Sequence, residues 1–142
     1  LCGGDRARME QAVLFQMAFP GMPCVFYGDE KGLEGASENE YRRPMDFGRA
    51  DGLEEAYRRM IALRKEHPAL RHGDFQTVLA QGALFLCRRE AAGESLLLCW
   101  NAGGEALPVP GLPKDALPLL QKGWKGGLLE GRGYVVFQTA KP

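Results

Sequence analysis

The sequence lacks an excess of either charge and has no long hydrophobic run. Its 142 residues contain 18 Lys plus Arg and 18 Asp plus Glu, so the formal net charge is zero. Surfaces that bind nucleic acids carry clustered positive charge, and the balance argues against such a partner. No apolar stretch approaches the roughly 20 residues that span a bilayer. Charged residues at positions 5, 6, 8 and 10 interrupt the amino-terminal segment, so no signal peptide is visible there. We expect neither a nucleic-acid partner nor a membrane contact.

Residues that bind metals or act as nucleophiles are also scarce. The two histidines, His67 and His72, are too few for a three-ligand site and flank the end of a predicted helix. Neither Ser37 nor Ser95 lies in a G-x-S-x-G motif, which argues against serine catalysis. The four cysteines, at positions 2, 24, 87 and 99, include no pair spaced for zinc or redox work. We therefore expect no metal, no cofactor and free thiols, as is typical of the reducing cytoplasm.

Two segments have the periodicity of amphipathic helices. From Asp5, which can cap a helix, apolar side chains recur at three- and four-residue intervals until Pro20 and Gly21. The segment 53–63 repeats the pattern, carries pairs of opposite charge four residues apart, and is followed by Pro68. Both segments predict helices.

Between these segments, the chain predicts a strand followed by a long loop. Residues 22–27 are continuously apolar, as is typical of a short strand buried on both faces of a parallel sheet. Residues 28–52 contain five glycines and many charges, with no sustained periodicity. Loops of this length are usually functional or disordered.

After Gly73 the pattern changes to short strands separated by glycine-containing turns. The expected strands are 75–79, 83–89, 96–101, 106–109, 128–129 and 134–139. Such a series favours an antiparallel sandwich. The chain should therefore mix α and β structure, with a boundary between a first part, 1–70, and an all-β second part, 71–142.

Candidate functional side chains gather around the long loop. Asp29 and Glu30 are neighbours, so in an extended strand they would point to opposite faces and could not easily converge on one sugar bond. One of them could instead fix the loop through backbone hydrogen bonds. Glu38 and Arg42 could pair with each other while binding a ligand, or form a solvated structural ion pair. Tyr27 could offer a stacking face or belong to the core.

The same residues carry a resemblance to a known family. The run FPGMPCVFYGDE at 19–30, followed by RRPM at 42–45, resembles the last barrel strand of the alpha-amylase superfamily, glycoside hydrolase family thirteen. The segment 57–75 resembles the eighth barrel helix and the passage into the family's all-β C-terminal domain. The RRPM loop is most similar to the neopullulanase, cyclomaltodextrinase and maltogenic amylase branch.

This resemblance implies the fold and the activity of a parent enzyme. Residues 1–70 would be the last βα portion of a TIM (β/α)8 barrel, and residues 71–142 a β-sandwich domain. The parent would be a retaining alpha-glucan hydrolase, whose three catalytic carboxylates lie on the fourth, fifth and seventh barrel strands. We expect these strands to precede Leu1, so the chain would be a C-terminal fragment that has no catalytic residue and is inactive alone.

The resemblance also implies site residues. By position, Glu38 and Arg42 would bind a glucose unit of the substrate, although the family usually has aspartate at the first position. Tyr27, Asp29 and Glu30 would support this site or form the rim of its cleft.

The expected partners are an alpha-glucan or maltooligosaccharide substrate and the remainder of the parent barrel. Copies of the isolated fragment should associate through residues 9–30, because a barrel strand without neighbours exposes backbone groups and apolar side chains. Two alternatives stay open. One is a stand-alone carbohydrate-binding module in which Trp100 and Trp124 stack on sugars, and the other is a structural module that braces a barrel.

Overall fold

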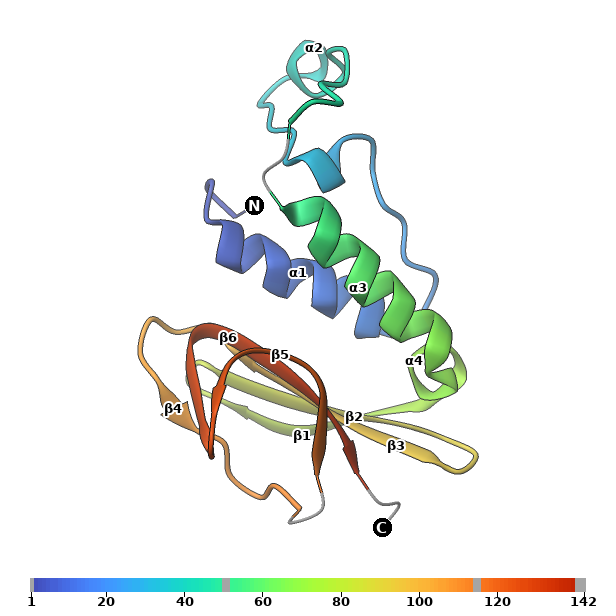
Figure 1. The fold of residues 1–142 in the computed structure, drawn as a ribbon, viewed down its shortest axis with the longest axis vertical. Helices are drawn as coiled ribbons and strands as arrows, with labels where there is room; N and C mark the ends of the chain where they lie inside the picture. The colour runs from blue at the N-terminus through green and yellow to red at the C-terminus, as the bar shows by residue number, and fades with distance from the viewer. Residues whose placement is uncertain (1, 50–51, 114–115, 140–142) are drawn as a thin grey trace.

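The protein combines a layer of helices with a six-stranded antiparallel sheet (Figure 1). The structure is a computed structural model that describes residues 2–49, 52–113 and 116–139. The helices are α1 (Arg6–Ala18), the 3-10 helix η1 (Asp29–Lys31), α2 (Glu38–Tyr41), α3 (Leu53–Glu66) and α4 (Pro68–His72). The strands are β1 (Asp74–Gln81), β2 (Leu84–Ala91), β3 (Glu94–Asn101), β4 (Leu107–Pro108), β5 (Leu117–Lys125) and β6 (Leu128–Thr139). The predictions of mixed structure and of an antiparallel sheet are confirmed.

The two predicted long helices form where the periodicity placed them. The side chain of Asp5 accepts the backbone N–H of Arg8 at 3.1 Å and caps α1, which ends shortly before Pro20. In α3, basic residues occupy the last turn, where the helix dipole favours positive charge. No helix in the described part of the chain is long and apolar enough to cross a membrane.

Two arginines bind the backbone carbonyls at the C-terminal end of α1. Arg64 of α3 donates a hydrogen bond to the carbonyl of Met17 at 2.6 Å. The buried Arg89 of β2 donates to the carbonyls of Ala18 and of Gly73, the latter at 2.9 Å. Burial lowers the pKa of both guanidinium groups. Because positive donors complement the negative end of the helix dipole, these arginines fix α1 against both α3 and the sheet.

The sheet has the order β1-β2-β3-β6, with β4 and β5 also paired to β6. Alternating side chains bury both of its faces. The face toward the helices includes Leu96, Leu98, Trp100, Tyr134 and Val136. The other face includes Leu86, Leu97, Cys99, Val135 and Phe137, with Trp124 packed against it. All six strands thus belong to one hydrogen-bonded sheet with a core cluster on each face, and the sandwich arrangement stays a prediction.

The apolar run 22–27 does not form the predicted strand. Residues 22–26 have no regular secondary structure, and Met22 is 95% exposed. A parallel strand requires neighbours for its backbone hydrogen bonds. All strand pairs among the described residues are antiparallel and join segments between positions 74 and 139. The run 22–27 therefore has the apolar residues of a buried strand, but no parallel strand among the described residues pairs with it.

Two further differences concern the second half of the chain. The strand β5 was not predicted, because Pro118 and Gly123 interrupt its pattern, yet it pairs with β6 along most of its length. The strand β6 continues through residues 131–133, where a turn was expected. Pairing with β3 on one side and β5 on the other holds this segment extended.

The main hydrophobic core crosses the predicted boundary after residue 70. It combines Leu14 of α1 and Met60 of α3 with Leu98 and Val136 of the sheet. The helix α4 itself spans residues 68–72. The helices and the sheet therefore share one core, and the division into 1–70 and 71–142 stays a prediction about the parent protein.

Candidate functional site

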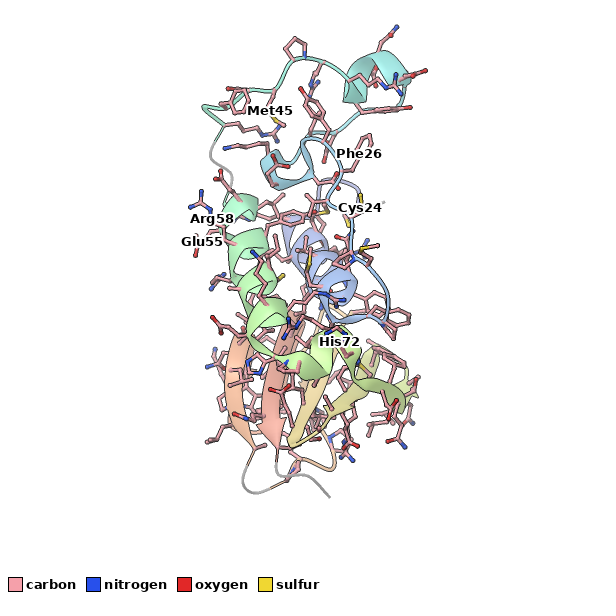
Figure 2. The ribbon with its side chains drawn as sticks, turned by 90° about the vertical axis from the view of Figure 1, so that its right-hand side faces the viewer. Cys24, Phe26, Met45, Glu55, Arg58 and His72 are labelled. Carbon is pink, nitrogen blue, oxygen red and sulfur yellow. The ribbon has the colours of Figure 1, made fainter. Side chains whose placement is uncertain are left out.

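The segment that contains η1 and α2 forms the end of the molecule opposite the sheet (Figure 1). Phe26 and Met45 lie on its two limbs, one before η1 and one after α2 (Figure 2). This end carries all five site residues that the sequence predicts, namely Tyr27, Asp29, Glu30, Glu38 and Arg42.

Gly28 makes the turn from which this end of the molecule starts. Its φ angle is +83°, and a β carbon there would lie 2.7 Å from the side chain of Leu33. The carbonyl of Gly28 accepts the N–H groups of Lys31 and Leu33 at 3.0 and 2.9 Å. Only glycine combines this left-handed conformation with so close an approach. Asp29 and Glu30 therefore lie on the short helix η1 rather than at the end of a strand.

Asp29 binds the backbone beside its own turn. One carboxylate oxygen accepts the N–H of Phe26 at 3.2 Å. Burial raises the pKa of Asp29, and the nearby charge of Glu30 acts in the same direction. Burial, followed by the charges of Asp29 and Glu30, also raises the pKa of Tyr57 to about 12. Both acidic residues belong to η1, which contacts α3.

Tyr27 links the two limbs of the segment. Its hydroxyl donates a hydrogen bond to the carbonyl of Arg43 at 3.1 Å, and the side chain stays partly exposed. The ring of the preceding Phe26 meets the ring of Tyr41 edge to face, with centroids 6.3 Å apart. These contacts hold the residues after α2 near the residues before η1.

Glu38, the first residue of α2, and Arg42, the residue after its end, form an ion pair. Arg42 Nη1 lies 2.6 Å from Glu38 Oε1, and the two side chains are 69% and 62% exposed. Glu40 has a different role, because its carboxylate accepts the N–H groups of Ala36 and Ser37 at 2.6 and 3.3 Å and so fixes the start of the helix. The pair of Glu38 and Arg42 is left open to solvent.

A cleft of about 890 Å³ lies between the start of α1 and the loop. Its charged lining residues are Asp5, Arg6, Asp29, Glu34, Glu40, Arg43 and Arg49. Ligand pockets have volumes of about 300 to 1,000 Å³. Of the five predicted residues, only Asp29 lines this cleft. The approach of Asp5 and Arg6 to the loop has no local signal in the sequence, so sequence reasoning missed them.

The carbohydrate-module alternative relies on two tryptophans, of which Trp100 is buried in the core. Trp100 is 5% exposed and packs against Phe15 and Phe85, with ring centroids 5.8 and 5.7 Å away. Trp124 packs edge to face on Phe137 at 5.1 Å. A sugar needs an accessible ring face, which Trp100 does not present. Within the described ranges, no three His, Cys, Asp or Glu side chains are grouped to hold a metal ion.

Comparison with known proteins shows what this chain is similar to. No family model matches it. A cyclomaltodextrinase from Geobacillus thermopakistaniensis (strain MAS1) is 32% identical over 139 residues, which is 94% of this chain and 23% of that protein. Neopullulanase 2 from Thermoactinomyces vulgaris is 40% identical over 113 residues, which is 76% of this chain and 19% of that protein.

The solved structures agree with these relatives. A Nostoc punctiforme debranching enzyme, in crystals soaked with acarbose, matches with a TM-score of 0.82 and 30% identity. The match covers 96% of this chain and 30% of that chain. The chain spans less than a quarter of the length of the two curated relatives.

Proposed function

We propose, from the homology of this chain to the C-terminal part of alpha-amylase-superfamily enzymes named cyclomaltodextrinase and neopullulanase, that it is the C-terminal portion of a retaining alpha-glucan hydrolase. The homology confirms the resemblance that the motifs at 19–30 and 42–45 indicate. In this proposal, residues 1–70 complete a (β/α)8 barrel and residues 71–142 form its C-terminal β domain. The buried free thiols of Cys87 and Cys99 are consistent with a cytoplasmic location.

The proposed role of this portion is to hold part of an alpha-glucan or maltooligosaccharide. The exposed ion pair of Glu38 and Arg42 is the observation that carries this proposal. A sugar hydroxyl both donates and accepts hydrogen bonds, so a carboxylate beside a guanidinium complements it. The contacts of Tyr27 with Arg43 and of Asp29 with Phe26 support the same end of the molecule. We propose Tyr27, Asp29 and Glu30 as supporting or rim residues.

The catalytic carboxylates would come from another part of the parent protein. A retaining mechanism needs two carboxyl groups about 5 Å apart across one sugar bond. Among the carboxylates around the cleft, Asp5 caps α1 and Glu40 binds the start of α2. We therefore expect the chain alone to release no reducing sugar from maltoheptaose. Cleavage by the pure chain would contradict this part of the proposal.

The rest of the barrel is the partner that the exposed apolar residues fit. Met22 is almost fully exposed, and Phe26 and Phe47 also project into solvent. A parallel barrel would supply both backbone partners for 22–27 and a cover for these side chains. Without it, copies of the chain should associate through residues 9–30, and light scattering on the pure chain measures whether they do.

Binding of maltotriose to the chain, followed by NMR titration, tests the substrate role. Arg42→Ala should weaken binding by about tenfold, the effect of losing roughly 1.4 kcal/mol of charge-assisted hydrogen bonding. Arg59→Ala is the control, because Arg59 is also an exposed arginine four residues after a glutamate, Glu55, on α3, although their separation is longer, at 4.0 Å. Equal affinities for the wild type and Arg42→Ala would overturn the role of α2.

A further inference from the structure

Lys31 joins three segments that are separate in the sequence. It is the last residue of η1, and its side chain is only 15% exposed. Its ammonium lies 2.6 Å from a carboxylate oxygen of Glu54, in the first turn of α3. It also donates to the carbonyls of Phe47 and Arg49, at 3.4 Å each. An ammonium group has three N–H donors, and each has an acceptor here.

These contacts close the base of the loop that carries α2. The loop leaves η1 after Lys31 and returns at Phe47, so one side chain ties the point of departure to the point of return. Closing a loop in this way removes conformational freedom from all residues between the two points. The hydrogen bond and the charge of Lys31 also lower the pKa of Glu54.

We propose that Lys31 is a positioning residue for the substrate-binding pair Glu38 and Arg42. This inference rests on the proposed function, since it assigns Lys31 the task of holding α2 where that pair meets the sugar. Lys31 touches no substrate in this proposal. It acts through the carbonyls of Phe47 and Arg49, anchored to the rigid helix α3 by Glu54.

Glu54 has a second ion pair that serves as an internal control. Arg58 Nη2 lies 2.5 Å from the other oxygen of the Glu54 carboxylate, and its side chain is highly exposed. Figure 2 shows Arg58 on the outer side of α3. Because Glu54 and Arg58 belong to the same helix, this pair joins no separate segments. Loss of Arg58 removes one positively charged partner of Glu54 but leaves the contacts of Lys31 that close the loop in place.

The test compares Lys31→Met with Arg58→Met in the full chain. Hydrogen exchange of the loop amides, maltotriose affinity and exchange of the sheet amides are measured for both variants. Lys31→Met should accelerate exchange of the amides in 33–46 by about tenfold and weaken maltotriose binding by about fivefold, with sheet exchange unchanged. Arg58→Met should change neither loop exchange nor binding. Lys31→Arg should show the loop exchange and the maltotriose affinity of the wild type, because a guanidinium can still donate to the Glu54 carboxylate and to both carbonyls.

Three outcomes would overturn the proposal. Unchanged hydrogen exchange of the loop amides in Lys31→Met would show that the contacts of Lys31 do not order the loop. Faster exchange of loop and sheet together would show a general loss of stability instead of a positioning effect. Faster loop exchange with unchanged binding would separate Lys31 from the sugar site. If the wild type itself binds no maltotriose, the proposed function of α2 fails, while the exchange data still decide whether Lys31 orders the loop.

Discussion

Replacing Leu14 by alanine tests whether the helices and the sheet are one cooperative unit. Leu14 is fully buried in α1, in the same core cluster as Met60 of α3 and as Trp100 and Val136 of the sheet. If this shared core decides stability, a cavity on the helix side must destabilise the strands as well.

The size of the effect follows from burial. Replacement of a fully buried leucine by alanine costs about 2.7 to 5.0 kcal/mol, and less where neighbours can fill the cavity. Met60 of the same core cluster has an unbranched side chain that can adapt to a nearby cavity, and we expect about 3 kcal/mol. With a urea dependence of about 2 kcal/mol/M, the midpoint of unfolding should fall by about 1.5 M.

Urea unfolding is followed by far-UV circular dichroism and by tryptophan fluorescence, since Trp100 lies in β3. Both signals should shift by the same amount in Leu14→Ala. Leu117→Ala is the control, because Leu117 is 65% exposed in β5 and its loss should change stability by less than about 0.5 kcal/mol. A shift in the helical signal alone would refute the single unit and favour two independently folding parts.

Three further changes have definite expected results. Arg89→Met should lower the free energy of unfolding by about 2 to 4 kcal/mol in the same urea assay, because the carbonyls of Ala18 and Gly73 lose a charged donor. The cost of burying the guanidinium charge also disappears, which limits the loss. Asp29→Asn should stabilise the chain at neutral pH, because the raised pKa of Asp29 means that its ionised form is penalised in the folded state. This advantage should disappear as the pH falls from the raised pKa of folded Asp29 to the ordinary pKa of aspartate; parallel stability curves over the whole pH range would contradict this. A thiol reagent should modify the exposed Cys24 in the native protein. It should modify Cys87 and Cys99 only after unfolding, because both are buried and burial raises their pKa values to about 12. Rapid reaction of all four thiols in the native protein would contradict this.

Local patterns predicted most of the regular structure. The helices α1 and α3 follow from apolar periodicity and, for α1, from the cap at Asp5, and each of these signals lies within one segment. The strands β1, β2 and β3 follow in the same way from short runs between turn residues. The motifs at 19–30 and 42–45 also identified the family, since they depend on the order of residues alone.

Strand pairing was harder to predict, because it depends on partners far away in the chain. The apolar run 22–27 looks like a parallel strand, but the described residues contain no parallel neighbour for it. Conversely, β5 has a weak pattern and forms because β6 presents a complete row of backbone groups to it. Alternation likewise could not show that one sheet would bury both faces.

The sequence by itself determined which side chains are candidates for the site, since Tyr27, Asp29, Glu38 and Arg42 all lie in one stretch of the chain. Only the tertiary structure decided how they are held. The ammonium of Lys31 reaches Glu54 across 23 positions, and Arg89 reaches the end of α1 across 71. Local patterns arise from steric and hydrogen-bonding preferences within a few residues. These long-range contacts, in contrast, form only after the core of helices and sheet has brought distant segments together.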